Sequence, residues 1–340
     1  MEQDILFGDN SSGKTNMLEA VFVLCLGRSH RHVSEAVLIK QGNEFYRIEG
    51  LILNNGQINN VAVASQKGGK RKITLDKEPL KNVELFKRFC VVTAGPEDSE
   101  IISGPPSLRR GFIDIYLSQI SIKYISILTE YKKILAQKNA ALKRGINPTP
   151  FNELLIKSGA WIIKTRQEFL EDIKIKSTEH YENISQGGSF NLEYKPSISI
   201  EQGVTSIVEI KAAFEQSINR IHKRERILET SLVGPHRDEV LFTINSFPAR
   251  NYGSQGEWRT AALSLKLAIY SLIKEKRKTN PVLLLDEVFA ELDTKRTKAL
   301  LKTLKSVEQL FLTTALEPPM FVDKKCTSYN IKNGNIVKII

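Results

Sequence analysis

Apolar residues recur along the chain with two different periods, and the change of period divides the sequence. Near the N-terminus, the short apolar run 5–7 precedes a Gly/Ser-rich turn, and residues 17–24 then repeat apolar positions at helical spacing. Apolar and polar residues alternate in the next segments, which predicts strands of an antiparallel β-meander. These strands are expected at residues 45–53, 60–65 and 71–76. A further buried strand is expected at 89–92, before the turn 93–98.

Helical periodicity dominates the middle of the chain. Residues 120–143 carry an apolar residue at nearly every third or fourth position. Other helices are expected from Ser107 onward, at 154–181 and at 212–229, with short strands near 192–200. These helices are tens of residues long, not the hundreds of a long coiled-coil arm. A mainly helical lobe, residues 97–230, therefore interrupts the β-rich part of the chain.

Beyond residue 230 the strand pattern returns. Residues 240–244 alternate, and residues 258–276 predict a helix. The continuous apolar run 281–285 is typical of a parallel strand buried on both faces. A last apolar strand is expected at 310–312, and two short strands close the chain. We therefore predict an α/β fold with a mixed sheet, formed by residues 1–96 and 231–340, into which the helical lobe is inserted.

The charge balance indicates the class of partner. The 340 residues include 49 Lys and Arg against 38 Asp and Glu, a formal net charge of +11, which suits a polyanion and favours nucleic acid over a membrane surface. Cys25, Cys90 and Cys326 lie far apart in the sequence, so neither a disulfide framework nor a metal cluster is expected, as in the reducing cytoplasm. No apolar run approaches the roughly 18 residues of a membrane span, and no secretory signal precedes the first strand, so we expect a cytoplasmic protein.

The turn after the first strand carries the most specific motif. Gly8-Asp9-Asn10-Ser11-Ser12-Gly13-Lys14-Thr15 fits the pattern G-x-x-x-x-G-K-[ST] at every fixed position, between an apolar strand and a helix. The two glycines allow the backbone to curl round an anion, with the N–H groups of the helix start facing the phosphates. Lys14 then contributes a charge to the β- and γ-phosphates, and the Thr15 hydroxyl ligates Mg²⁺. The alternative is an ordinary Gly/Ser-rich turn.

A second chemical motif ends the apolar run near residue 285. Asp286 is predicted to hold Mg²⁺ through water, and Glu287 to orient and deprotonate the attacking water, because ligands bind at the carboxyl ends of parallel strands. In the alternative interpretation both carboxylates cap the next helix. Asp293 is either a nucleotide contact or the N-cap of a helix from Thr294. Thr314, at the end of the last buried strand, is a candidate γ-phosphate sensor.

The turn Ser254-Gln255-Gly256-Glu257 precedes the predicted helix 258–276. Backbone N–H groups and a Ser hydroxyl at a helix N-terminus form a potential anion site, although an ordinary Ser N-cap explains the residues equally well. Basic residues after the first helix, Arg28 and Arg31, either contact phosphates or cap that helix with positive charge. Arg109 and Arg110 are further candidates for DNA contact.

Together these motifs resemble the ABC-type ATPases of the SMC class, and within that class the RecF family of bacterial recombination mediators. The match runs from the phosphate-binding loop (P-loop) to the C-terminal strands. The segments that carry it are residues 8–20, 27–31, 96–98, 109–110, 234–238, 254–259 and 285–293.

The resemblance implies an ATPase head with a helical second lobe. It also implies a weak, DNA-stimulated ATPase that uses ATP and Mg²⁺, and an ATP-dependent homodimer in which Ser254, Gln255 and Gly256 of one subunit close over the γ-phosphate held by Lys14 of the other. The family binds single- and double-stranded DNA near gaps, works with RecR and RecO, and helps to load RecA during recombinational repair and replication-fork maintenance.

Two features depart from the family pattern. Family members carry strands upstream of the P-loop that this sequence lacks, and Thr314 stands where many ABC ATPases have a His. Other classes remain open: a P-loop kinase, the ATPase subunit of a transporter, or an ATPase fragment or scaffold without a role in repair. The 254–257 turn and the helical insertion, in place of an acceptor lid, argue against the kinase.

Overall fold

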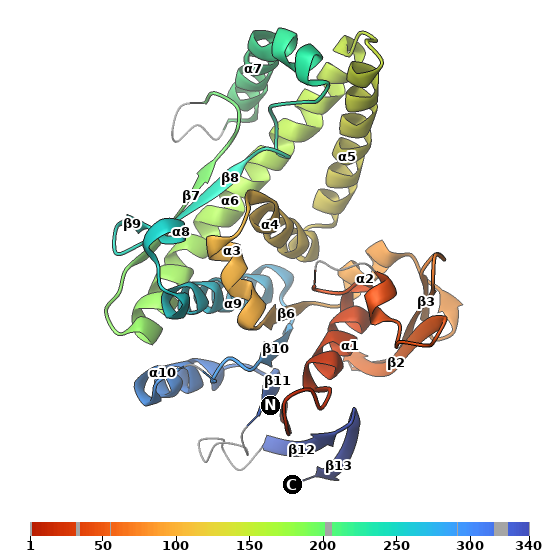
Figure 1. Cartoon of the computed structure of the whole chain (residues 1–340), viewed down its shortest axis with the longest axis vertical. Coiled ribbons are helices and arrows are strands. Elements are labelled where there is room, and N and C mark those ends of the chain that lie inside the picture. The colour runs from red at the N-terminus through yellow and green to blue at the C-terminus, as the bar shows by residue number, and fades with distance from the viewer. Residues whose placement is uncertain are drawn as a thin grey trace. The chain divides into compact units, whose positions relative to one another are not determined.

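The computed structural model describes residues 2–31, 35–54, 56–200, 206–290, 292–315 and 326–339. Contacts between residues divide the chain into two compact units (Figure 1). The first comprises residues 1–98, 183–186 and 262–340, and the second comprises residues 99–182 and 187–261.

The first unit is built on a six-stranded sheet. Its strands, in spatial order, are β13 (Asn335–Ile339), β12 (Cys326–Lys332), β1 (Glu2–Phe7), β11 (Gln309–Thr314), β10 (Val282–Asp286) and β6 (Val91–Ala94). Neighbours pair in parallel, except that β12 and β13 are antiparallel, so the predicted mixed sheet is confirmed. The strands β1, β11 and β10 are neighbours in this order and run parallel, so their carboxyl ends lie at the same edge of the sheet.

A second sheet in the same unit is the predicted meander. Its antiparallel strands are β2 (Phe45–Asn54), β3 (Gln57–Gln66), β4 (Lys72–Leu75) and β5 (Glu78–Pro79). Helix α1 (Lys14–Leu26) contacts both this sheet and the strands β6, β10 and β11 (Figure 1). Phe22, Val23 and Leu26 are fully buried, because a helix covered on two sides needs apolar residues around most of its circumference.

The remaining elements of this unit connect and cover the two sheets. They are the 3₁₀ turns η1 (Glu35–Leu38) and η2 (Pro96–Asp98), the helices α2 (Asn82–Arg88) and α10 (Thr294–Leu304), and the later turns of α9 (Gln255–Arg277), which begins in the second unit. Leu283, Leu284 and Leu285 of β10 have no exposed surface, as the continuous apolar run predicted.

The second unit is mainly helical. Its helices are α3 (Ser99–Ser103), α4 (Pro106–Ile120), α5 (Ile122–Lys143), α6 (Asn152–Ser185), α7 (Ile207–Leu228) and α8 (Ala249–Tyr252), with the turn η3 (Thr149–Phe151). Helices α5 and α6 lie side by side (Figure 1), and the rings of Tyr124 and Trp161 pack between them with centroids 6.2 Å apart.

A three-stranded antiparallel sheet belongs to this second unit. It consists of β7 (Phe190–Lys195), β8 (Glu239–Ile244) and β9 (Phe247–Pro248). Because β8 pairs with β7 along its whole length, residues 231–261 cluster with the helical unit, whereas the sequence pattern grouped them with the C-terminal part of the ATPase lobe. Periodicity identified β8 as a strand but carried no information on its partner.

In the part of the chain that the structure describes, no helix combines the length and apolar character that crossing a bilayer requires.

Candidate nucleotide site

The predicted P-loop curls at the carboxyl end of β1. Gly8 and Gly13 have φ angles of 147° and 104°, in the region that glycine adopts most readily. A Cβ atom on Gly8 would lie 2.4 Å from the carbonyl oxygen of Ile331, and one on Gly13 would lie 3.1 Å from the Cα of Gly334. The backbone N–H of Gly334 also donates to the carbonyl of Ser12 at 2.6 Å. The hairpin β12–β13 therefore supports the loop from behind.

Lys14 starts α1, and its side chain turns back over the loop. Its Nζ donates to the carbonyls of Gly8 at 2.8 Å and Asp9 at 3.0 Å. It also lies 3.3 Å from Oε1 of Glu287, with only 5% of the Lys14 side chain exposed. The ammonium group is thus held at the mouth of the loop by oxygen atoms that a bound phosphate can replace.

Thr15 and Asp286 come together from positions 271 residues apart in the sequence. The Thr15 hydroxyl donates to Oδ1 of Asp286 at 3.0 Å, and the Thr313 hydroxyl donates to the same atom at 2.5 Å. A carboxylate and hydroxyl oxygens are the hard ligands that Mg²⁺ prefers. This donor set fits a magnesium ion.

Glu287 follows Asp286 in a left-handed backbone conformation, with φ of 48°. Its N–H donates to the Thr313 hydroxyl at 3.0 Å, and its Oε2 accepts the N–H of Ala315 at 3.1 Å. A non-glycine residue in this conformation is strained and persists only where its surroundings hold it. The end of β11 holds both the backbone and the carboxylate of Glu287, next to Lys14. Thr314, also at this end, is buried.

A lysine that the sequence analysis missed braces this edge of the sheet. Lys266 lies on the buried face of α9 and donates from Nζ to the carbonyl of Thr93 at 2.8 Å and to Oδ1 of Asp98 at 2.7 Å. Asp98 in turn accepts the N–H of Gly95 at 2.8 Å. A Cβ on Gly95 would stand 3.3 Å from that of Asp286. The signal was a single lysine inside the helical run 261–270, which is otherwise apolar apart from Ser264.

The 254–257 turn is a capping box at the start of α9. The Ser254 N–H and hydroxyl donate to the Glu257 carboxylate at 2.8 and 2.9 Å, and the Glu257 N–H donates back to the Ser254 hydroxyl at 3.3 Å. The N-cap interpretation is therefore confirmed. Ser254 and Gln255 are exposed, and Gly256 is partly exposed, so the anion-binding role stays a prediction.

Asp293 caps α10 in the same manner. Its Oδ1 accepts the N–H groups of Lys295 and Arg296, both at 2.9 Å. These hydrogen bonds hold the pKa of Asp293 below its ordinary value. A nucleotide contact from this exposed carboxylate remains a prediction.

The four arginines proposed to bind DNA have different surroundings. Arg28 is exposed, and Arg31 is partly exposed, with Nη1 3.8 Å from Oε2 of Glu19. Arg109 is buried: its Nε and Nη2 donate to the Glu239 carboxylate at 2.6 and 2.9 Å, and its Nη1 donates to the carbonyl of Gly104 at 2.8 Å. This arrangement does not support a direct DNA contact by Arg109, because the donors point into the second unit.

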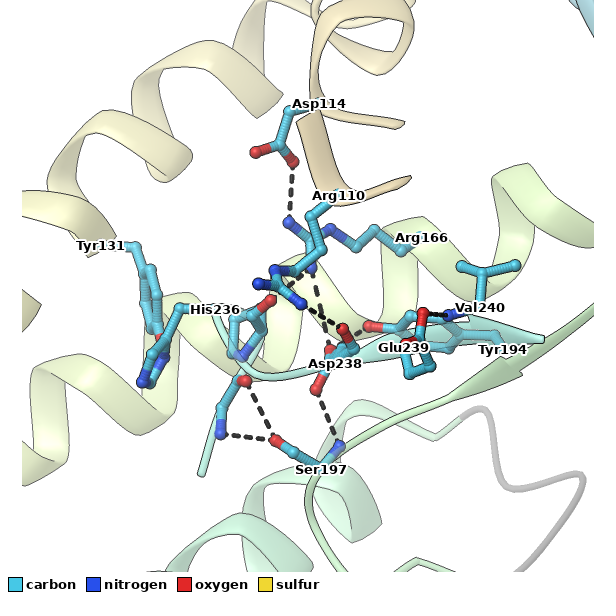
Figure 2. A network of polar contacts seen from close by, with 12 residues as sticks. Arg110, Asp114, Tyr131, Arg166, Tyr194, Ser197, His236, Asp238, Glu239 and Val240 are labelled. Atoms are coloured by element: carbon cyan, nitrogen blue, oxygen red, sulfur yellow. Dashed lines mark hydrogen bonds and ion pairs between the residues drawn. The ribbon is translucent and has the colours of Figure 1, made fainter. Parts of the chain in front are cut away.

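Arg110 lies at the edge of a buried polar network in the second unit (Figure 2). Its Nη1 donates to the carbonyl of Asp238 at 2.8 Å. The centre of the network is Arg166, which donates to Oδ1 of Asp114 at 2.8 Å and to the carbonyl of Pro235 at 2.6 Å. Burial alone would raise the pKa of Asp114, but Arg166 and Lys132 hold it below the ordinary value. The motif 234–238 thus anchors the strand β8 to the helices.

Comparisons with known proteins agree with this geometry. The family model described as the RecF/RecN/SMC N terminal domain matches residues 2–335. A Bacillus cytotoxicus protein named DNA replication and repair protein RecF is 35% identical over 343 residues, which cover 98% of this chain and 91% of that protein. The protein of the same name from Bacillus mycoides is 36% identical over 345 residues, which cover 98% of this chain and 92% of that protein.

Solved structures show the same likeness. The structure of the recombination mediator protein RecF with ATP, in the RecFOR pathway, superposes with a TM-score of 0.91 at 30% identity and covers 100% of this chain and 91% of that chain. The Smc head domain of Pyrococcus furiosus superposes with a TM-score of 0.54 at 15% identity, covering 100% of this chain and 89% of that chain, which shows the shared fold alone.

Proposed function

Because the chain belongs to the RecF family of SMC-type ATPases, we propose that it binds and slowly hydrolyses ATP, and that the bound nucleotide controls its dimerisation on DNA during replication and repair. The observation that carries this proposal is the convergence of Lys14, Thr15, Asp286 and Glu287 at one edge of the sheet.

The P-loop is proposed to bind the triphosphate. The N–H groups of residues 9–15 and the dipole of α1 favour an anion at the helix start, and Lys14 exchanges its carbonyl partners for phosphate oxygens. Thr15 and Asp286 would hold Mg²⁺, which neutralises phosphate charge when bound. ATP is the nucleotide present in a solved RecF relative, and we infer the same ligand here.

Glu287 is proposed as the general base. Its carboxylate lies beside Lys14 and is fixed by the end of β11, so it is positioned to accept a proton from a water that attacks the γ-phosphorus. Proton transfer to Glu287 and departure of ADP then yield phosphate. Slow, DNA-stimulated turnover would follow if a second subunit had to complete the site.

That second subunit would contribute the exposed turn at the start of α9. Ser254, Gln255 and Gly256 expose a helix N-terminus, which favours the γ-phosphate of a partner's ATP. ATP sandwiched between two subunits stabilises the dimer by mass action, and hydrolysis releases it. We propose DNA near gaps as the surface on which this cycle operates, with RecR and RecO as protein partners and RecA loading as the outcome. The name of the RecFOR pathway and the net charge of +11 support this assignment.

The decisive experiment is the molar mass of the Glu287→Gln variant, measured by light scattering with and without ATP and Mg²⁺. Removing the general base should slow turnover by about 10²–10⁴-fold without removing the phosphate ligands, so ATP persists and the mass should double. Lys14→Ala in the same background is the control and should remain monomeric. A Glu287→Gln protein that binds ATP but stays monomeric would contradict the sandwich.

A further inference from the structure

The C-terminal half of α7 carries an unusual concentration of exposed cations. Arg220, Lys223, Arg224 and Arg226 are all exposed, and Lys223 and Arg224 stand three and four residues after Arg220, on the same side of the helix. Among the described residues, these four side chains form no ion pair, and Arg220 donates only to the Ser199 hydroxyl. Positive charge therefore accumulates along this face.

The acidic residue of this half-helix is withdrawn from the surface. Glu225 is buried, with its Oε2 2.8 Å from Nζ of Lys138 on α5, and 0% of the lysine side chain is exposed. Its Oε1 accepts the Ser231 hydroxyl at 3.0 Å and the Leu232 N–H at 2.9 Å. The two charges cancel inside the unit, so neither changes the field outside it. The pair also fixes α5 against α7.

The end of α5 adds further cations beside those of α7. Residues 131–152 contain no Asp or Glu, and Lys133, Lys143 and Arg144 are exposed. Since Lys138 lies within this stretch and contacts Glu225 directly, the two basic segments adjoin. We call the exposed residues Lys133, Lys143, Arg144, Arg220, Lys223, Arg224 and Arg226 the α5–α7 basic face.

Two ordinary explanations account for only part of this face. Cations at a helix C-terminus interact favourably with the helix dipole, but that effect is confined to the last turn. Of the four α7 cations, Arg226 is the one that lies in this turn. A solvated helix surface normally mixes both signs, and the N-terminal half of α7 does so with Glu209, Lys211 and Glu215. In the C-terminal half of α7 the one acidic residue, Glu225, is paired internally, and the exposed Glu229 lies just beyond the end of the helix.

We propose that the α5–α7 basic face binds the phosphate backbone of duplex DNA. This proposal rests on the proposed function in that DNA is the ligand. The cations stand on a rigid helix, so little ordering is required, and those at 220 and 224, on the same side, are separated by about 6 Å of helix axis, within reach of two successive phosphates. The core side of α7, formed by Ile210, Phe214 and Ile218, is already buried. Its exposed large apolar side chains, Val208, Ile227 and Leu228, lie at opposite ends of the helix and do not form the continuous apolar stripe of a helix that lies in a membrane surface.

The test compares two charge reversals of equal size. Lys223→Glu/Arg224→Glu alters the face, whereas Lys298→Glu/Lys302→Glu alters two exposed lysines of α10 in the other unit. Binding of a labelled 30-base-pair duplex is measured with ATP and Mg²⁺ over a series of salt concentrations. Loss of two phosphate contacts should weaken binding by about 10–50-fold near 0.15 M salt and lower the slope of log K against log salt by about 1.8. The α10 variant should change neither quantity by a comparable amount.

The outcomes separate this proposal from the one on which it rests. A wild-type protein that does not bind the duplex would contradict the proposed DNA function. If the wild type binds, and the α7 variant matches the α10 variant in affinity and slope, the α5–α7 basic face is overturned. If the α7 variant loses binding to phosphatidylglycerol vesicles while its affinity for DNA stays unchanged, the proposal that this face binds DNA is also overturned. The neutral variant Arg220→Gln/Arg226→Gln should also bind the duplex more weakly. Urea unfolding of both α7 variants at the same midpoint as the wild type shows that a weakened affinity is not caused by unfolding.

Discussion

Among individual residues, Lys14 has the most direct consequence for ligand binding. Its ammonium is held by two backbone carbonyls and Glu287 at the mouth of the P-loop. Lys14→Ala removes the ammonium group that would donate to phosphate oxygens. Because charge-assisted hydrogen bonds are lost, we expect the affinity for ATP to fall by about 10²-fold. Isothermal titration calorimetry measures this, with the exposed Lys298→Ala as control. Unchanged affinity would exclude Lys14 from the phosphate site.

His236 predicts a pH dependence of stability. Burial lowers the pKa of His236 from 6.5 to about 4. Its Nδ1 lies 2.6 Å from the Tyr131 hydroxyl (Figure 2). Its Nε2 lies 3.2 Å from the Ser231 carbonyl, so the neutral ring uses both nitrogens. Between pH 6.5 and 4 the unfolded chain binds the additional proton, so the free energy of unfolding falls as the pH is lowered.

Between pH 7 and pH 5, protonation of His236 in the unfolded chain should lower the free energy of unfolding by about 2 kcal/mol. Other groups titrate in the same range, so the measurement is the difference between the wild type and His236→Asn in urea unfolding at several pH values. The variant should lose less stability on acidification. Parallel pH profiles for the two proteins would show that His236 is protonated equally in the folded and unfolded chains.

At the scale of elements, α9 joins the capping box at its start to the strand β6 through Lys266. Lys266→Met would leave Asp98 without its cation, and we expect a loss of about 3 kcal/mol in the free energy of unfolding. Lys274→Met, two turns later on the same helix, removes an exposed pair with Glu308 and should cost no more than about 0.5 kcal/mol. Denaturant unfolding of both variants tests this; equal losses would mean that Lys266 has no bracing role.

Sequence patterns predicted the elements better than the contacts between them. The P-loop, the carboxylates after β10 and the meander depend on local residue types and periodicity, which the sequence displays. The hairpin β12–β13 was expected as two short strands, but its contact with Gly8 and Gly13 depends on tertiary packing. Arg109 shows the same limit, because an arginine that satisfies Glu239 inside the unit has the same local sequence signal as one that faces DNA.

For the whole molecule, the prediction concerns assembly. Ser254 is exposed, and among the residues that the structure describes its hydroxyl bonds only with Glu257, so a large cation there should leave ATP binding by the single chain intact. In Glu287→Gln, the added Ser254→Arg should abolish the ATP-dependent doubling of mass, because the side chain would fill the space of the partner's phosphate. Light scattering and calorimetry together test this. Loss of both properties would indicate that the turn is needed only for folding.

The position of β1 between β11 and β12 has a consequence during synthesis. The strand that carries the P-loop leaves the ribosome long before its neighbours, which start at residues 309 and 326. At a synthesis rate of about 5–20 residues per second, the interval is about 15–60 s. During that time the apolar residues of β1 lack their sheet partners, so the nascent chain should depend on chaperones and should acquire ATP binding only after β11 and β12 emerge.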